Sequence, residues 1–198
     1  MQQLIENLEE NGFEVVLVKD AETALEIGKS YIKDGQSVGL GGSVTVTQIG
    51  MLDYLINHPN IKLYNQYEDG ISMEENLKRR REGLLSDIYI TSCNAITKNG
   101  ELVNADGSGN RVAAQIFGPK KVLLFVSTKK IVETLEDGFK RIMEHVAPKN
   151  VERMNKKLLQ MGKNPHYTLD NIANKFAYIN GDERGRTTII LIEEELGY

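Results

Sequence analysis

Cysteine, histidine and tryptophan are scarce in this sequence. Its 198 residues include one cysteine, Cys93, three histidines and no tryptophan. A single cysteine excludes an intrachain disulfide and a cysteine metal cage, and the dispersed histidines show no metal-ligand spacing. The sequence therefore predicts no metal site, no iron–sulfur cluster and no cofactor of its own.

The sequence also lacks a long hydrophobic run and an excess of basic charge. No apolar stretch approaches the ~18 residues of a membrane span, and residues 1–7 lack the basic and then apolar run of a signal peptide. The net charge of −4 argues against nucleic acid and anionic membranes as main partners. Together with the single cysteine, these features predict a cytoplasmic protein whose partners are neither nucleic acid nor membrane.

The residues that are abundant are those of a globular domain. Hydrophobic residues make up 40% of the chain and charged residues 26%. A chain of this length can bury a hydrophobic core without a disulfide or a structural metal. Strand-like segments alternate with helix-like ones, a pattern typical of βαβ units around a mostly parallel sheet. No repeat, low-complexity segment or linker divides the chain, so we predict one α/β domain over residues 1–198.

The element boundaries follow from hydrophobic periodicity, capping residues and turn signals. The predicted strands are 13–18, 37–40, 61–64, 87–91, 121–126, 176–179 and 188–192, and the predicted helices are 2–11, 20–32, 44–57, 73–86, 111–117, 130–146 and 149–161. An Asn-Gly pair within residues 96–103 predicts a hairpin with a type I′ turn. The last two strands are expected to be joined by a polar, glycine-rich turn.

The first candidate site is Gly41-Gly42-Ser43-Val44-Thr45, between a predicted strand end and a predicted helix start. The first turn of a helix exposes unpaired amide hydrogens, and glycines let a ligand approach the backbone. The hydroxyls of Ser43 and Thr45 can donate further hydrogen bonds, so the segment predicts an anion site. The alternative is structural: Ser43 caps the helix, and the glycines allow a tight turn. The segment is neither a Walker A loop nor a dinucleotide-binding fingerprint.

The second candidate is the polar segment 104–111, read as a loop that leads into a short helix. Arg111 would fall in the first helical turn, where a cation opposes the helix dipole. An anionic partner would explain it, either a ligand or Asp106. In an enzyme, Asp106 would be the general base or nucleophile and Arg111 the oxyanion clamp. The alternative is a tight turn at Asp106-Gly107 with Asn110 as helix cap. The candidate ligand-binding residues of this segment are Asn104, Gly107, Gly109 and Asn110.

The third candidate follows the strand predicted at 87–91, because ligands of open α/β sheets bind beyond the carboxyl ends of strands. Asn94 can donate to a ligand oxygen there, or it can simply occupy a strand-to-hairpin corner. Cys93 is interpreted as an inert buried thiol, since no activating histidine is evident in the sequence. Lys120 can face the site, although its place at the entry to a strand also explains it.

These segments make the chain similar to the LUD-domain (lactate-utilisation) family, formerly DUF162, over most of its length. The segments that carry the resemblance are 41–45 with Ile49-Gly50, 91–97, 100–104, 106–113 and 118–122. The resemblance implies a Rossmann-like three-layer sandwich of the sugar-phosphate isomerase and CoA-transferase-like group. Many relatives carry a cysteine-rich segment near the C-terminus, whereas residues 164 onward contain no cysteine here.

Members of that family are linked to the oxidation of L-lactate to pyruvate beside iron–sulfur partner proteins. The resemblance therefore implies a protein of organic-acid metabolism that binds an anionic small molecule at the two glycine-rich helix starts. Two alternatives stay open: an isomerase or acyl/CoA-transferase-like enzyme that uses Asp106 and Arg111, and a non-catalytic subunit that docks redox partners. Whether the chain forms a homo-oligomer also stays open.

Overall fold

The computed structural model describes residues 1–198 and places the strands in two sheets. The larger sheet has six strands, all parallel. In spatial order they are β1 (Glu14–Val18), β10 (Thr187–Ile192), β7 (Lys121–Ser127), β4 (Ile88–Thr91), β2 (Ser37–Leu40) and β3 (Lys62–Tyr64). The smaller sheet contains β8 (Ile131–Val132), β5 (Ala95–Thr97), β6 (Leu102–Asp106) and β9 (Lys175–Ile179), also in spatial order. The predicted α/β class with a mainly parallel sheet is confirmed.

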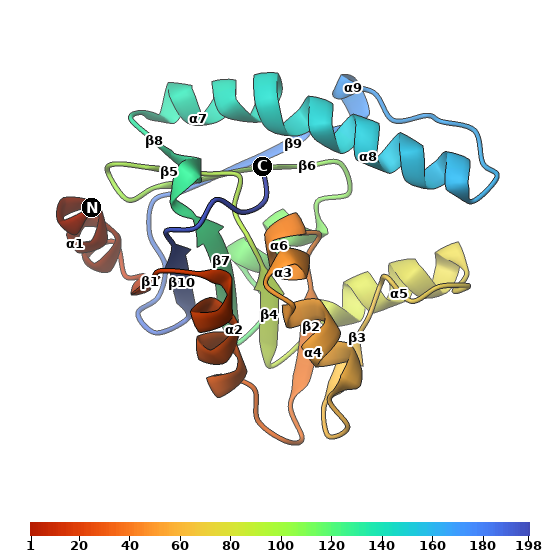
Figure 1. The fold of residues 1–198 in the computed structure, drawn as a ribbon, viewed down its shortest axis with the longest axis horizontal. Coiled ribbons are helices and arrows are strands. Elements are labelled where there is room, and N and C mark those ends of the chain that lie inside the picture. Colours follow the sequence, from red (N-terminus) through yellow and green to blue (C-terminus); the bar gives the residue numbers. More distant parts are fainter.

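The helices lie on both faces of the large sheet and above the small one (Figure 1). They are α1 (Gln2–Glu10), α2 (Ala21–Ser30), α3 (Val44–Gln48), α4 (Met51–Asn57), α5 (Met73–Gly83), α6 (Asn110–Ile116), α7 (Leu135–Arg141), α8 (Ala147–Gln160) and α9 (Leu169–Ile172), with a 3-10 turn η1 (Thr128–Lys130) and a π-helical turn η2 (Ile142–Val146). None of them combines the length and the apolar character that crossing a bilayer requires.

Strand β7 contributes side chains to two hydrophobic cores, one on each face of the large sheet. Side chains along a strand alternate between the faces of its sheet. Leu123 and Phe125 pack with residues of α2, α3 and α4 on one face. Leu124 and Val126 pack on the other face with α1, α6 and the inner side of the small sheet. Two covered faces make the predicted three-layer sandwich, and a third core lies between the small sheet and the α7–α8 region.

Two of the predicted helices differ from the structure. Residues 44–57 form two helices because Gly50, at φ 79°, breaks the run and begins α4. The helix expected at 130–146 begins only at Leu135, where Thr134 and Asp137 form a capping box. Ile131 and Val132 instead pair with β5 as strand β8.

Pro148 does not separate two helices, as the sequence suggested. Helical backbone continues from α7 through η2 into α8, with Pro148 in the first turn of α8. The amide of Ala147 donates to the carbonyl of Ile142, five residues back, which is the hydrogen bond of a π-turn. Pro148 has no amide to donate, and the π-turn directly before it is where the continuous helix departs from the regular hydrogen-bond pattern.

The hairpin is confirmed, but its predicted turn type is wrong. A type I′ turn needs two positive φ angles, whereas only Gly100 has one, at 81°, and no residue other than glycine does. The Gly100 amide donates to the carbonyl of Thr97, and the Thr97 amide donates to the carbonyl of Glu101. These bonds define a three-residue turn with a glycine bulge. The second strand, β6, also continues to Asp106, into the segment read as a loop.

The two strands at the end of the chain belong to different sheets. β9 is an edge strand of the small sheet and pairs antiparallel with β6. β10 lies inside the large sheet, between β1 and β7, and is parallel to both. The last residues then run back between the large sheet and the α7–α8 layer, where Figure 1 places the C-terminal end.

Candidate functional site

The first and second candidate segments meet at the carboxyl ends of β2 and β4. The amide of Gly41 donates to the carbonyl of Ile90 (2.9 Å) and so continues the β2–β4 pairing past β2. A Cβ atom at Gly41 would lie 2.7 Å from Cβ of Thr91 and 3.1 Å from Cγ of Arg111. Glycine is therefore required where Arg111 crosses the strand end. From the sequence, Asp106, Asn110 and Arg111 are expected near Gly42 and Ser43, because both segments follow strand ends at one edge of a sheet. The structure brings the two segments into contact at Gly41 and Arg111.

Ser43 and Thr45 have partners within the protein. Ser43 Oγ accepts a hydrogen bond from the amide of Val46 (3.1 Å), so Ser43 caps α3, as the structural alternative predicts. Helix α3 has only five residues, and so short a helix carries little dipole. Thr45 is fully buried and is discussed below with its partner. Gly42 lies beside the Tyr67 hydroxyl, which would be 3.3 Å from a Cβ atom at Gly42.

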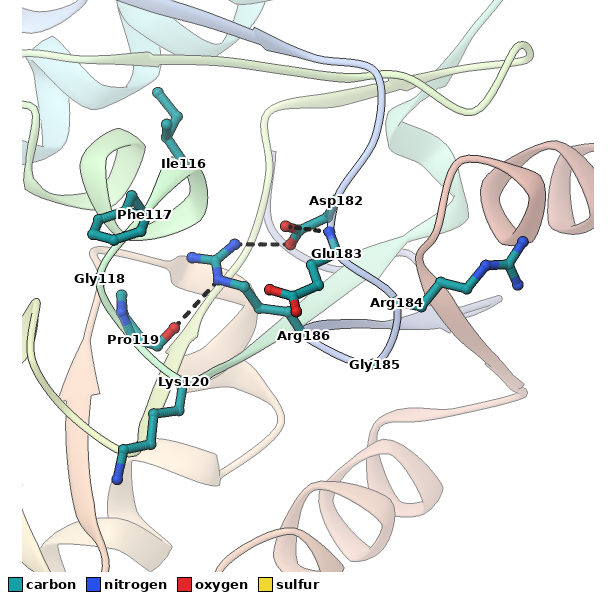
Figure 2. A pocket seen from close by; sticks show the side chains of 10 residues that line it. All are labelled: Ile116, Phe117, Gly118, Pro119, Lys120, Asp182, Glu183, Arg184, Gly185 and Arg186. Carbon is teal, nitrogen blue, oxygen red and sulfur yellow. Dashed lines mark hydrogen bonds and ion pairs between the residues drawn. The ribbon is translucent and has the colours of Figure 1, made fainter.

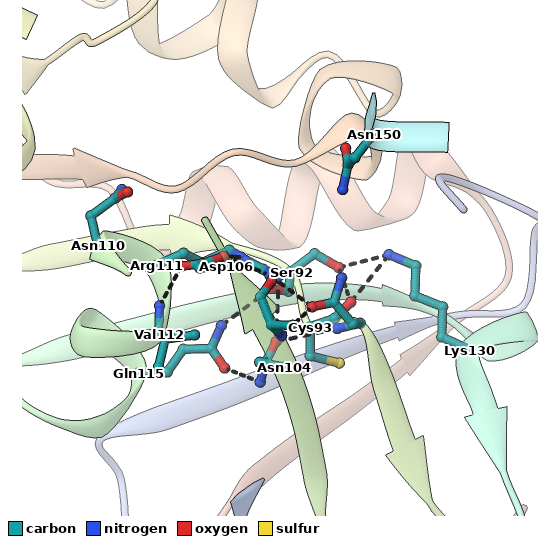
Figure 3. A network of polar contacts seen from close by, with 12 residues as sticks. Ser92, Cys93, Asn104, Asp106, Asn110, Arg111, Val112, Gln115, Lys130 and Asn150 are labelled. Atoms are coloured by element: carbon teal, nitrogen blue, oxygen red, sulfur yellow. Dashed lines mark hydrogen bonds and ion pairs between the residues drawn. The ribbon is translucent and has the colours of Figure 1, made fainter. Parts of the chain in front are cut away.

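Arg111 uses all five of its N–H groups within the protein. The side chain is buried, and its five hydrogen bonds go to Asp106 Oδ1 from Nε (2.9 Å), to the Ser92 carbonyl and Asn104 Oδ1 from Nη1 (3.1 and 3.4 Å), and to Asn94 Oδ1 and the Ala105 carbonyl from Nη2 (both 2.7 Å). Figure 3 shows this network between the strand ends. In this geometry Arg111 cross-links β4, β6 and the loops after them.

Both oxygens of the Asp106 carboxylate accept hydrogen bonds within the protein. Its Oδ1 accepts from Arg111, and its Oδ2 accepts from the amide of Val112 in the first turn of α6 (2.9 Å). Asn104 has no exposed surface and donates through Nδ2 to Gln115 (2.8 Å). A reacting role for Asp106 and Arg111 requires these bonds to rearrange, and it stays a prediction.

Three other residues of the second segment shape the loop. Gly107 packs against the carbonyl of Asn171, which would be 2.6 Å from a Cβ atom at Gly107, so no larger residue fits. Gly109, at φ 90°, begins α6, a position that the sequence reading gave to Asn110. Asn110 instead donates to the hydroxyl of Tyr89 (3.2 Å). No observation links these three residues to a ligand, and their binding role stays a prediction.

Lys120 is not part of this cluster. It precedes β7, so it lies at the amino edge of the sheet, opposite the carboxyl ends that carry the other candidates. Its side chain is 79% exposed and pairs with Asp87 at 2.7 Å. The same ion pair, with hydrogen bonds from Ser37, lowers the pKa of the Asp87 carboxyl. The expectation that Lys120 faces the site is wrong in this structure.

A candidate residue that the sequence reading missed is Lys130, at the end of the 3-10 turn after β7. Its side chain is buried, with 4% of the residue exposed, and no carboxylate lies within 4 Å. Its Nζ donates to three neutral oxygens: the hydroxyls of Thr45 (3.1 Å) and Ser92 (2.9 Å) and the carbonyl of Cys93 (3.4 Å). Figure 3 shows the Lys130 side chain reaching the network from the side opposite Asn110.

The electrostatics around Lys130 are those of a cation without a counter-ion. Burial, together with the charges of Arg141 and Arg111, lowers the pKa of Lys130 to about 8. Burial raises the pKa of the neighbouring Cys93 thiol, although all three cations lie near it. Cys93 is therefore a neutral buried thiol, which agrees with the reading of an inert cysteine.

Arg141, at the end of α7, is a second cation without a carboxylate partner. Its Nη1 donates to the carbonyl of Asn94 (2.7 Å), and no other hydrogen bond joins this side chain to the protein. Burial lowers the pKa of Arg141. A polar group of its partner residue also lacks a hydrogen bond: the Nδ2 amide of Asn94. We call Lys130, Arg141 and Asn94 the cationic cluster.

The last residues of the chain cover Lys130. A Cβ atom at Gly197 would lie 3.2 Å from Lys130 Nζ and would clash with the hydroxyl of Thr45. The Gly197 amide donates to Gln48 (2.6 Å), and the hydroxyl of Tyr198 accepts from Arg153 of α8 (2.7 Å). The segment 196–198 thus passes over the amine between α3 and α8.

A separate cavity lies away from the cationic cluster. It has a volume of about 470 Å³ and is lined by residues 116–120 and 182–186, at the far end of α6 (Figure 2). One of its two arginines, Arg186, donates to the carbonyls of Ala114, Gln115 and Pro119 and to the carboxylate of Asp182. We assign this cavity a structural role, since Arg186 and Asp182 already hold the end of α6. No group of histidine, cysteine or acidic residues in the chain has the arrangement of a metal site.

Comparisons with known proteins place the fold. A family model for the LUD domain matches residues 1–192. A DUF162 family protein from Deinococcus radiodurans has a similar structure, with 15% identity, a TM-score of 0.52 and coverage of 96% of this chain and 94% of that one. A D-ribose-5-phosphate isomerase in complex with phospho-erythronic acid is similar at 11% identity and a TM-score of 0.43, over 89% of this chain and 95% of that one. No curated protein sequence matches the chain.

Proposed function

This chain belongs to the LUD-domain family, and from that premise we propose that it binds a small organic anion at the cationic cluster, in the service of lactate or other organic-acid utilisation. The observation that carries the proposal is the buried amine of Lys130. Its three hydrogen-bond partners are neutral, and no carboxylate balances its charge. An unpaired buried charge costs several kcal/mol of folding free energy, and a bound anion would offset that cost.

The groups around Lys130 support an anion of carboxylate size. Arg141 keeps a planar set of unused N–H donors, which match the two oxygens of a carboxylate. The side-chain amide of Asn94 can donate to a further oxygen of the same ligand. Arg111 and Asp106 then form the frame of the site. Arg111 donates a hydrogen bond to the side-chain oxygen of Asn94, which fixes the orientation of the Asn94 amide group.

The enzyme alternative, isomerase or acyl transfer with Asp106 as base or nucleophile, lacks such an observation. The carboxylate oxygens of Asp106 accept hydrogen bonds from Arg111 and Val112, which assign Asp106 a structural part in the loop. The alternative of a subunit that docks redox partners is equally without a structural observation in its favour. Turnover by the purified chain would support the first alternative, and co-purification without any ligand response would support the second.

Calorimetry and thermal shift with lactate, pyruvate, phosphosugars and CoA esters test the proposal. We expect at least one of these anions to bind the wild-type chain, and binding to fall at least tenfold in Lys130→Met and in Arg141→Met, since each removes a charge-assisted contact of ~1.5–3 kcal/mol. Lys129→Met is the matched control, because Lys129 precedes Lys130 and is exposed. Equal binding by Lys130→Met and wild type would contradict the proposal.

A further inference from the structure

We propose that Lys130 is a nucleophilic amine that captures the carbonyl carbon of a short 2-oxo acid as an imine. The inference rests on the proposed anion site, because the same side chains hold the ligand. It adds a reaction and a substrate class: an acid with a ketone or aldehyde carbon next to its carboxylate. Lactate, phosphate and CoA esters can bind the cations, but they have no such carbon.

The positions of the two cations fit a 2-oxo acid. Lys130 Nζ donates to the carbonyl of Cys93, and Arg141 Nη1 donates to the carbonyl of Asn94, the next residue. The charge of Arg141 is also among those that lower the pKa of Lys130, so the guanidinium lies near the amine. In a 2-oxo acid the carbonyl carbon is bonded directly to the carboxylate carbon. The inference requires that a carboxylate held by Arg141 presents this carbonyl carbon to Nζ.

The surroundings of Lys130 also favour a reactive amine. A lysine becomes nucleophilic when burial and a neighbouring cation disfavour its charged form, and both are present here. With a pKa of about 8, about a quarter of the side chains are neutral at pH ~7.5, against roughly one in a thousand for an ordinary lysine. No carboxylate is close enough to hold the proton on Nζ.

The reaction balances without an oxidant or a reductant. The neutral Nζ attacks the carbonyl carbon, a C–N bond forms, and the carbonyl oxygen takes up a proton. The amine gives up its protons through the hydroxyls of Thr45 and Ser92, which lie 3.1 and 2.9 Å from Nζ. The C–O bond breaks, one water leaves and a C=N bond remains. Water reverses the sequence and releases the acid.

Entry to the amine requires Gly197 and Tyr198 to move, while Leu196 stays anchored in the hydrophobic core. Gly197 lies over Nζ and its amide donates to Gln48, while the Tyr198 hydroxyl accepts from Arg153 and donates to Asn150. Each of these hydrogen bonds is worth ~0.5–1.5 kcal/mol net. Their opening is compatible with a ligand that replaces them by contacts to Lys130 and Arg141.

Reductive trapping tests the inference directly. The full chain is incubated with pyruvate or glyoxylate and cyanoborohydride, which converts an imine into a stable secondary amine. We expect one adduct per chain, located on Lys130 by peptide mapping and formed at least tenfold faster than on any exposed lysine. Lys130→Met should lose the fast adduct, Lys129→Met should keep it, and lactate should give none. Because mapping of the wild-type chain identifies the site, the test holds even where a variant folds poorly.

The two proposals fail in different ways. An adduct spread over surface lysines, equally in wild type and Lys130→Met, would overturn the imine while calorimetry still showed pyruvate bound at the cationic cluster. Absence of both the adduct and any Lys130-dependent anion binding would overturn the imine and the anion site together. A fast adduct on Lys130 that disappears in Arg141→Met would support both, because the carboxylate must then rest on Arg141.

Discussion

Two buried cations, Arg111 and Lys130, lie in one hydrogen-bond network at the carboxyl ends of the strands. They differ in their counter-ions and in their hydrogen-bond partners. Arg111 has a carboxylate partner in Asp106 and an acceptor for each N–H group. Lys130 is buried to a similar extent, has no carboxylate and donates only to neutral oxygens. The comparison assigns Arg111 to the scaffold and makes Lys130 the residue on which the proposed anion site depends.

The largest effect on stability is expected from removing Arg111, the cation whose hydrogen bonds are all satisfied. Arg111→Ala leaves the Asp106 carboxylate without its counter-ion and strands several buried acceptors, so we expect a loss of about 3–5 kcal/mol in the free energy of unfolding. Urea unfolding of Arg111→Ala, Asp106→Ala and the double variant measures it. Strong coupling between the two changes is expected, since each alone leaves a buried charge. A stable Arg111→Ala protein that has lost only its ligand response would reverse the roles assigned here.

Replacing Lys130, the cation without a counter-ion, is expected to increase stability instead. Lys130→Met keeps the length of the side chain but removes a buried charge, so the ligand-free protein should gain about 1–3 kcal/mol in its free energy of unfolding at pH ~7. Denaturant melts of wild type, Lys130→Met and Lys129→Met compare the buried with the exposed position. A clear loss of stability in Lys130→Met alone would show that the amine is a structural donor.

The pH dependence of the free energy of unfolding tests the lowered pKa of Lys130. The folded-state pKa of Lys130 is lowered, from 10.5 to about 8, so the unfolded chain binds more protons between these values. The destabilisation is complete below pH ~8 and disappears as pH rises through ~10.5, where Lys130 is neutral in both states. The stability gap between Lys130→Met and wild type should therefore narrow over that window. A gap that stays constant from pH 7 to pH 10.5 would contradict a depressed pKa.

The smallest effect is expected at the exposed pair Lys120–Asp87. Solvent screens this bridge, and Lys120 lies at the opposite edge of the sheet. Lys120→Ala should change the free energy of unfolding by no more than about 0.5 kcal/mol and leave anion binding unaltered. Thermal melts with and without the bound anion check both points. A loss of binding would return Lys120 to the site.

The contact between segment 41–45 and segment 104–111 could be predicted, because it depends only on the direction in which the strands run. Both follow strands whose carboxyl ends lie at one edge of a parallel sheet. The same rule places Lys120 at the other edge, since it precedes its strand. Lys130 could not be found in this way: with Lys129 before it, it has the pattern of a solvent-exposed pair that begins a helix. The short strand β8 and the passage of Gly197 are what bury it.

Local sequence determined the alternation of elements, the helix caps at Ser43 and Thr134 and the glycines at the close approaches, because each depends on neighbours within a few residues. Which buried cation receives a carboxylate depends on groups distant in the chain. Asp106 reaches Arg111 five residues away, whereas Lys130 meets Thr45 and Ser92 across 85 and 38 residues. Only the packed sheet brings those hydroxyls to the amine, and burial there withdraws the water that would otherwise balance its charge.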